Sequence, residues 1–526
     1  MINKKNIINY KEKKQPKNNL ITDYNTKESI LFIDRGRLDA AYTNSYFVAA
    51  VNNKYKKKIY VLNTYKDNRI TKIYKNLGFR YFIDTSLYKI LFNPYTLTKC
   101  FGIFIVCLIN LKKKGFMWFI NSFRVNKILI GDLIYDTYLR QNNNYLNPKI
   151  DFFFIKKLIS AIYKTIKINE FLKKYNIKII ITGTEHYSYD SGLATRISTY
   201  KKNVRNFMWD SPGKESYIEI VELNRKTKLI GHNSLQDKII LRRFNNLKIN
   251  EKKVNEFFYN RKKFKTSNFY TRNSFGRANQ GNGDKFLEKI KELKKNKYGK
   301  ILLYASHRLS DVTHLLGITY CFQDYYNQFK ETLDYVYKND DNNIWIFRPH
   351  PSSNLDIERT QLYSLFKKYK KKNILFCPRN VPVEKLKKIC DFVVSARGTI
   401  ALEFLCEGKP VILAGVPRYF HKLLGFKCYL NKSEYFKVLS NLHTIKNPSI
   451  KVINLAKKIL FFYENAMHIK RIIRFKDYKK DNLAKKIFNF TFNLRNKSIN
   501  NFNFLKTHLS KNLDKSYFFL LVKKVI

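Results

Sequence analysis

The chain has 526 residues, of which 44% are hydrophobic and 27% charged, a composition that excludes a disordered protein and fits two or three globular domains. Its 101 Lys and Arg outnumber 40 Asp and Glu, giving a formal net charge of +61. The electrostatic field of so positive a protein favours anionic partners, such as nucleotides, anionic lipid, acidic polysaccharide or nucleic acid, over basic ones. Heavy Lys and Asn use is also typical of A/T-rich coding DNA, so charge does not select among these partners.

The first 27 residues are predicted to form a flexible arm. Strands are then expected at 30–34, 58–62 and 80–83, with helices at 42–52 and 71–77 between them. This alternation predicts βαβ units on a parallel sheet. A helix at 153–174 and strands at 177–182 and 206–209 complete an N-terminal Rossmann-like acceptor domain over 28–246.

Residues 86–145 of this domain are predicted to be a helical insertion. Phe101 to Leu111 is strongly apolar, but it is about half the ~20 residues that a membrane span needs. Three lysines follow it, and then a second apolar run from Gly115 to Ile120. A buried helix of the first domain is the expected structure, and an interfacial helix pair is the alternative.

Residues 247–298 are polar and are predicted to link two halves of the molecule. Strand and helix then alternate again over 299–431, which predicts a C-terminal Rossmann-like domain that binds a nucleotide-sugar. The expected strands are 300–305, 343–347, 373–376, 391–394 and 410–413, and the expected helices are 321–337, 357–370, 383–389 and 399–407. Residues 432–526 are predicted to be a helical, basic extension. The predicted fold class is α/β, with two Rossmann-like domains facing a central cleft.

The seven cysteines form no CxxC pair, and several lie in apolar runs. They indicate buried thiols in a reducing compartment rather than disulfides or a zinc site. Residues 1–16 are Lys-rich and lack the apolar core of a signal peptide. We therefore expect a cytoplasmic protein.

The polar segment after the strand at 391–394 is the strongest candidate site. Its candidate residues are Ser395, Arg397, Gly398, Thr399 and Glu403. Gly398 would let the backbone approach a phosphate. The Ser395 and Thr399 hydroxyls and the free N–H groups of the following helix would donate hydrogen bonds to it. Arg397 would add a pair of charge-assisted hydrogen bonds. Glu403 would accept from ribose hydroxyls. The alternative is an ordinary βαβ turn in which Thr399 caps the start of the helix and Gly408 its end.

Two further polar segments follow predicted strands. Arg348 and His350 stand in Arg-Pro-His-Pro, where prolines hold the loop rigid and the imidazole can donate to, or protonate, a leaving phosphate; a structural His in a capped turn is the alternative. His307, Asp311 and His314 follow the strand at 300–305 and suit acid/base work, unless they are scattered residues of a polar loop. The chain has no DxD sequence and no fourth ligand near these histidines, so neither a metal nor a cofactor is expected.

Residues 300–425 resemble the capsule polysaccharide biosynthesis family, bacterial capsule glycosyltransferases that include Kdo transferases. The matching stretches are His307…Asp311…His314, Phe322–Tyr326, Trp345–Pro351 and Gly398–Thr399…Glu403…Gly408–Val411, with a weaker match at Trp209–Gly213. The resemblance implies a GT-B fold and a nucleotide-sugar donor in the C-terminal domain, frequently a CMP-linked acidic sugar. In related sialyl- and polysialyltransferases a His-Pro motif and a Ser/Thr motif contact CMP. His350–Pro351 and Ser395 with Thr399 correspond to them.

Three departures from the family pattern leave the sugar and base open. Arg348 replaces the more usual Lys, Arg308–Leu309 stand where Cys-Phe is common, and Ala396–Arg397–Gly398 replaces a Ser-Gly loop. On the acceptor side, Glu185 with His186, and then Asp34, follow predicted strands and are the candidate bases, because ligands bind beyond the carboxyl ends of strands.

The expected function is a metal-independent glycosyltransferase acting on a cell-surface or capsular polysaccharide or its lipid-linked acceptor. A teichoic-acid-type polyol-phosphate transferase is the alternative enzyme. A non-catalytic component of a capsule-assembly complex and a basic nucleic-acid-binding protein are the alternatives from other classes, although no nucleic-acid-binding module is visible and nucleic acid is not an expected partner. An anionic inner membrane surface is a further candidate partner.

Overall fold

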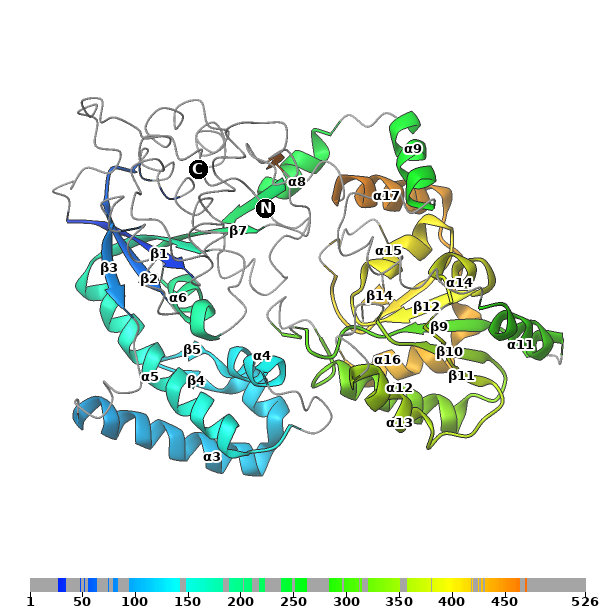
Figure 1. Ribbon diagram of the computed structural model, residues 1–526, viewed down its shortest axis with the longest axis horizontal. Coiled ribbons are helices and arrows are strands. Elements are labelled where there is room, and N and C mark those ends of the chain that lie inside the picture. The colour runs from blue at the N-terminus through cyan, green and yellow to red at the C-terminus, as the bar shows by residue number, and fades with distance from the viewer. Residues whose placement is uncertain are drawn as a thin grey trace, which may run out of the picture. The chain divides into compact units, whose positions relative to one another are not determined.

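Figure 1 shows the computed structural model. The chain divides into two compact units, residues 1–83 with 477–526, and residues 84–476. The described residues are 27–34, 56–63, 79–83, 94–141, 148–182, 189–210 without 202, 217–222, 238–247, 251–262, 283–311 without 296–297, 313–314, 320–350, 357–417 without 380, 427–428, 431–463, 469–470 and the single residues 48, 52, 55, 74, 419 and 424.

The first unit contains three parallel strands. Strand β1 (Ser29–Asp34) is buried along its whole length and pairs with β2 (Lys58–Asn63), which pairs with β3 (Arg80–Ile83). A near-continuous hydrophobic run such as that of β1 is typical of a parallel strand with both faces covered. The three predicted strands are confirmed, while the helices predicted at 42–52 and 71–77 lie largely outside the described residues.

The second unit begins with a helical layer of α3 (Pro94–Ser122), α4 (Gly131–Gln141) and α5 (Phe152–Lys174). The long helical stretch predicted over about 86–145 contains α3 and α4, and a hairpin of β4 (Arg124–Val125) and β5 (Ile128–Leu129) separates them. Its two turn residues have positive φ, as a tight hairpin requires. Gly131 is needed where α4 begins, since a Cβ there would stand 1.8 Å from the Phe119 carbonyl oxygen.

The next elements are β6 (Ile177–Thr182), α6 (Tyr189–Thr199), β7 (Arg205–Asp210) and β8 (Tyr217–Glu222). Strands β6 and β7 are parallel, whereas β8 runs antiparallel to β7 and to the short β15 (Ile469–Lys470). A buried ion pair joins α6 to α4, with Arg196 Nη2 2.7 Å from Asp132 Oδ2. Sequence patterning predicted β6 and β7 but neither β8 nor β15.

A six-stranded parallel sheet forms the C-terminal part of this unit. Its strands are β9 (Ile301–Ala305), β10 (Ile344–Arg348), β11 (Ile374–Phe376), β12 (Phe392–Ser395), β13 (Val411–Leu413) and β14 (Lys427–Cys428). They lie in the order β11-β10-β9-β12-β13-β14. In chain order this is 3-2-1-4-5-6, the Rossmann order. The predicted α/β fold class is therefore confirmed.

Helices cover both faces of this sheet (Figure 1). Leu303, Ile346 and Val393 pack with α8, α11, α14, α15 and α17, whereas Trp345 and Phe347 pack with α12, α13 and α16. These helices are α8 (Lys238–Asn245), α9 (Glu251–Lys262), α11 (Asp284–Lys295), α12 (Tyr325–Asn339), α13 (Ile357–Phe366), α14 (Val383–Ile389), α15 (Thr399–Cys406), α16 (Lys432–Ser440) and α17 (Ile450–Phe461), and Leu442–Thr444 is a 3-10 turn. Alternating residues of each strand thus serve two separate cores.

Two predicted helix boundaries shift by four residues. Helix α12 begins at Tyr325 rather than at residue 321, because the Asp324 carboxylate accepts from the Asn327 N–H and caps it, and Tyr320 forms a β-bridge with Gly415. Helix α13 ends at Phe366 rather than at residue 370. The predicted linker, 247–298, includes α9 and α11, and the predicted domain boundaries stay predictions.

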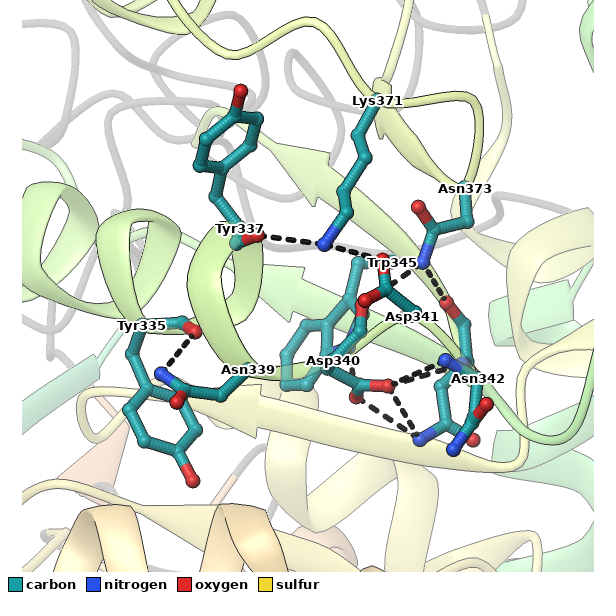
Figure 2. A network of polar contacts seen from close by, with 10 residues as sticks. Tyr335, Tyr337, Asn339, Asp340, Asp341, Asn342, Trp345, Lys371 and Asn373 are labelled. Carbon is teal, nitrogen blue, oxygen red and sulfur yellow. Dashed lines mark hydrogen bonds and ion pairs between the residues drawn. The ribbon is translucent and has the colours of Figure 1, made fainter.

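A polar network fixes the start of β10, at the amino end of the sheet (Figure 2). The Asp340 carboxylate accepts from the Asn342 and Asn343 N–H groups at 3.1 and 3.0 Å and from the Trp345 indole at 2.8 Å. The side-chain amide of Asn373, just before β11, donates to the Asp340 and Asn343 carbonyls. Asp340 thereby ties the end of α12 to two neighbouring strands.

Replacing this carboxylate should weaken the sheet without touching its opposite end. Asp340→Ala leaves several donors without their acceptor, so we expect the free energy of unfolding to fall by about 2 kcal/mol. Urea titration of both proteins measures the change. Asp341→Ala, which removes an exposed ion pair with Lys371, is the control and should change it by less than about 1 kcal/mol; equal effects of the two variants would contradict the prediction.

Candidate functional site

The three predicted motifs meet at one edge of the C-terminal sheet. Strand β9 lies between β10 and β12, and Ala305 is in register with both Arg348 and Ser395. The chain leaves β9 and β12 in opposite directions along the sheet, so their carboxyl ends form the topological switch point at which open α/β sheets bind ligands. The polar segments beginning at 306, 348 and 395 start there.

Arg348 ends β10 and is buried. Its carbonyl accepts from the Ser306 N–H at 2.9 Å, and the Ser306 hydroxyl in turn accepts from the His350 N–H at 3.1 Å. Ser306, which sequence reasoning missed, thereby joins the loops after β9 and β10. The Arg348 Nη1 atom has no hydrogen-bond partner among the described residues.

Arg397 lies two residues beyond β12, with only 5% of its surface exposed. Its guanidinium carbon is 5.2 Å from the centre of the Tyr320 ring. Tyr320 is itself fixed, because its hydroxyl donates to Gln328 Oε1 at 2.6 Å. None of the three side-chain nitrogens of Arg397 has a hydrogen-bond partner within the described part of the chain. The site therefore holds a buried cation whose donors have no acceptor among the residues that the structure describes.

Helix α15 begins directly after this arginine. Gly398 is its N-cap residue, with φ −68° and ψ 152°, and no side chain caps the helix. The alternative in which Thr399 is the N-cap is wrong, since Thr399 is the first helical residue. Gly408, with φ 75°, follows the C-cap residue Glu407, as a glycine at a helix end commonly does.

Ser395 and Glu403 already have partners inside the fold. The Ser395 hydroxyl donates to the Ala305 carbonyl at 2.9 Å. The Glu403 carboxylate, buried on α15, lies 3.4 Å from Lys387 Nζ on α14. Both side chains thus stabilise the surroundings of the site, and their expected contacts with a donor stay predictions.

The His307 and His350 rings lie side by side. The His307 ring stacks on Tyr325, with centroids 4.3 Å apart, and its centroid is 5.8 Å from that of His350. The Asp311 Oδ2 atom lies 3.8 Å from His307 Nδ1. Burial, and then the neighbouring His307, lower the pKa of His350 to about 3. His350 is therefore neutral at physiological pH and can donate one ring N–H.

His314 is bound by a helix of the preceding layer. Its Nδ1 lies 2.8 Å from Asp136 Oδ1 on α4, and its backbone N–H donates to Asp136 Oδ2 at 2.9 Å. Both side chains are buried, and the His314 Nε2 atom has no partner among the described residues. The predicted cluster therefore divides: His307 pairs with Asp311, and His314 pairs with Asp136. Nothing in the sequence marked Asp136.

A second contact with α4 lies beside the first. The Tyr135 hydroxyl donates to Asp324 Oδ2 at 2.6 Å and accepts from the Gln323 amide at 2.8 Å. Burial raises the pKa of Asp324, although its bonds from Tyr135 and Asn327 oppose the rise. The family-like stretch Phe322–Tyr326 thus connects α4 to the start of α12.

The predicted acceptor-side residues are not brought to this edge by any described contact. Asp34 ends β1 in the other unit and is buried. Glu185 and His186 lie outside the described residues. Their catalytic roles stay predictions. In the described part of the chain, no three His, Cys, Asp or Glu side chains are grouped so as to hold a metal ion.

With this geometry established, comparison with known proteins gives one family. Residues 223–426 match the family described as capsule polysaccharide biosynthesis protein. The resemblance predicted from the motifs is thereby confirmed over this segment. The matched segment, residues 223–426, contains all three motifs at the switch point. No curated protein matches the sequence.

Several solved structures are distantly similar. A glycosyltransferase from Rickettsia africae is 12% identical, covering 91% of this chain and 100% of its own, with a TM-score of 0.25. The UDP-GlcNAc 2-epimerase from Neisseria meningitidis bound to UDP-GlcNAc is 10% identical over 82% and 93%, with a TM-score of 0.26. The wall teichoic acid polymerase TagF is 12% identical over 90% of both chains, with a TM-score of 0.21. The fold class rests on the strand order itself.

The lowered pKa of His350 gives a pH-dependent stability. An unfolded imidazole takes up a proton near pH 6.5, whereas the folded one does so at about 3. The unfolded state thus binds more protons between these values, and the free energy of unfolding should fall as pH decreases below about 6.5. His350 keeps part of its surface exposed, which moderates the effect.

Urea titrations of the wild type and His350→Gln across this pH range test that dependence. The unfolding free energy of the wild type should fall more steeply on acidification than that of the variant, because the variant lacks the titrating group. His443→Gln, at an exposed position, is the control and should track the wild type. Parallel curves for His350→Gln and the wild type would show that this imidazole does not contribute.

Proposed function

We propose that this protein is a glycosyltransferase of capsule biosynthesis that holds a nucleotide-sugar donor at the switch point of its C-terminal sheet. The observation that carries the proposal is the Arg397 guanidinium, 5% exposed and without a hydrogen-bond partner among the described residues. An uncompensated buried charge costs several kcal/mol. A bound phosphate would supply the missing counter-charge and acceptors.

Other groups at the same edge suit the same ligand. The N-terminus of α15 offers free N–H groups and the positive end of a helix dipole, directly after Arg397. Arg348 has an unused nitrogen, and neutral His350 can donate a ring N–H. Two arginines and a helix terminus provide the positive charge that a leaving nucleotide phosphate needs. We therefore propose a mechanism that does not require a metal.

The proposed reaction is a displacement at the anomeric carbon of the donor sugar. The bond from this carbon to the phosphate oxygen breaks, and the acceptor hydroxyl oxygen forms the new bond. Its proton passes to a base of the acceptor side, for which Glu185, His186 and Asp34 remain the candidates. The electron pair of the broken bond stays on the phosphate, where Arg348 and Arg397 would stabilise it.

The donor we propose is a CMP-linked acidic sugar, on the strength of the family resemblance and the His350 and Thr399 positions. The proposed acceptor is a cell-surface or capsular polysaccharide or its lipid-linked precursor. The proposed location is the cytoplasm, where nucleotide-sugars are available. A polyol-phosphate transferase would use the same phosphate site with a CDP-linked donor, so a donor screen separates the two activities.

A thermal-shift panel of CMP, CDP, UDP and GDP tests the donor site. We expect CMP to stabilise the protein by about 2.7 kcal/mol at roughly 100 times its dissociation constant, with or without magnesium. Arg397→Met should lose the shift while leaving the ligand-free protein no less stable, because the variant removes an unpaired buried charge. Arg242→Gln, at an exposed position on α8, should keep the shift.

Other outcomes of the panel have different meanings. A shift with UDP or GDP alone keeps the site and overturns the CMP assignment. A loss of more than about 2 kcal/mol of stability in ligand-free Arg397→Met would make Arg397 a structural residue. The absence of any nucleotide shift in the wild type would overturn the proposal and favour a non-catalytic role.

Gly398 gives an independent test, because the fold itself does not require a glycine there. Its φ of −68° suits any residue, and an added Cβ would meet Ser395 Oγ at 3.4 Å and Ile400 Cγ2 at 3.6 Å, ordinary contact distances. Gly398→Ala should therefore cost no more than about 1 kcal/mol of stability. It should nonetheless weaken nucleotide binding at least tenfold, measured by calorimetry, because the methyl group enters the space of the phosphate. Unchanged affinity would contradict the proposed ligand position.

A further inference from the structure

The outer face of α3 is apolar and uncovered. Six of the eleven large hydrophobic side chains that are exposed among the described residues lie on this one helix. They are Tyr95, Leu97, Phe101, Ile105, Val106 and Ile109. The remaining five are scattered over α5, α9, α12, α13 and α17. The prediction of a buried helix is therefore wrong for one side of this run: the helix forms and buries Cys107 and Leu111, but Phe101, Val106 and Ile109 are exposed.

These side chains form a continuous stripe. Phe101, Ile105 and Ile109 follow one another at four-residue spacing, with Tyr95 and Val106 beside them, so all five lie on one side of the helix. We call this the outer face of α3. Phe101 and Val106 are 62% and 60% exposed. An apolar stripe of this length on a soluble helix indicates a surface that another molecule or a membrane covers.

The opposite stripe of α3 is fixed to the protein. Thr96, Cys100, Cys107 and Leu111 are buried on that side, and α3 packs along α5 (Figure 1). Burial raises the pKa of Cys107 to about 12, as expected for a thiol inside this helix–helix contact. Within the described residues, α3 is long and apolar enough to cross a membrane. If α3 crossed a membrane, it would have to separate from α5. Because α3 packs on α5, a helix that lies along the membrane surface is favoured over one that spans it.

Positive charge borders the outer face. Helix α3 contains no Asp or Glu. Lys112, Lys113 and Lys114 are all exposed and follow the apolar stripe, and Lys99 is exposed at its edge. Gly115, with φ 71° and ψ −178°, interrupts the helix immediately after this lysine cluster. The basic cluster therefore ends the exposed apolar stretch.

We propose that the outer face of α3 docks on an anionic lipid surface. An apolar face with lysines at its border matches the geometry of an interfacial helix, whose apolar side chains enter the headgroup boundary while its cations meet acidic headgroups. A second copy of the chain is disfavoured as the occupant, because each face would bring its lysines, and a formal net charge of +61, toward the other. This inference is independent of the proposed donor site.

Vesicle flotation of the full chain tests the docking. We expect it to float with phosphatidylcholine vesicles that contain phosphatidylglycerol, less so at high salt, and weakly with phosphatidylcholine alone. Phe101→Ser with Val106→Ser should lower partitioning at least about tenfold. Changing Lys112, Lys113 and Lys114 to Gln should lower it roughly a hundredfold on the anionic vesicles only.

Matched controls exist elsewhere in the chain. Tyr363→Ser with Ile450→Ser removes two exposed apolar side chains from α13 and α17, and changing Lys367, Lys368 and Lys370 to Gln removes three exposed lysines. Both controls should float as the wild type does. Flotation unchanged by the α3 variants overturns the proposal. So does a wild type that binds no vesicles and self-associates through α3 in sedimentation velocity. The nucleotide-induced thermal shift should survive in every variant, which separates this test from that of the donor site.

Discussion

The structure around the switch point depends on one constraint: the Arg397 guanidinium is buried and has no hydrogen-bond partner among the described residues. Arg397 is held over the Tyr320 ring, and Tyr320 is held in turn by its bond to Gln328 and its bridge to Gly415. Such an arrangement opposes the stability of the ligand-free protein, because a desolvated charge has lost its water and gained no acceptor. Sites that stabilise charge during a reaction are commonly arranged in this way, with the cost met by the surrounding fold.

The parallel sheet supplies the stability that offsets this unfavourable burial, and it determines where the loops of the site lie. Hydrophobic cores on both faces fix β9, β10 and β12 in register, so the loops that follow them begin at one edge. Hydrogen bonds then fix the positions of the loops at this edge. Ser306 joins the loops after β9 and β10, and Ser395 ties β12 to the Ala305 carbonyl. A phosphate would therefore meet donors that are already oriented, which lowers the entropy cost of binding.

The helical layer of α3, α4 and α5 helps to position the site. Helix α4 supplies Tyr135 and Asp136, which bind Asp324 and His314 of the family-like segment, and Asp132 pairs with Arg196. Each of these carboxylates is buried and would be costly if left alone. Through these bonds α4 determines where the segment after β9 lies. On the other side of the layer, α3 keeps an apolar stripe exposed.

Much of the site could be predicted from the sequence because its residues follow buried strands directly. The hydrophobic runs before Arg348 and Ser395 identify β10 and β12, and carboxyl ends of parallel strands share an edge, so convergence of the motifs follows from the chain itself. Strand β14 has only two residues, too few for a periodic pattern, whereas β8 has six residues, four of them hydrophobic, and was missed all the same. By itself, then, the sequence determined the α/β class, the sheet edge and most of the phosphate-site candidates.

Only the tertiary structure decided how those candidates are used. Ser395 and Glu403 have partners within the fold, whereas Arg397 has no hydrogen-bond partner in the described part of the chain. His314 is bound by a helix about 180 residues earlier in the chain. The exposure of α3 was equally undetermined, because an apolar run has the same sequence whether it is buried or uncovered. The pairing and burial of a side chain depend on residues that are distant in sequence, so local sequence patterns cannot predict them.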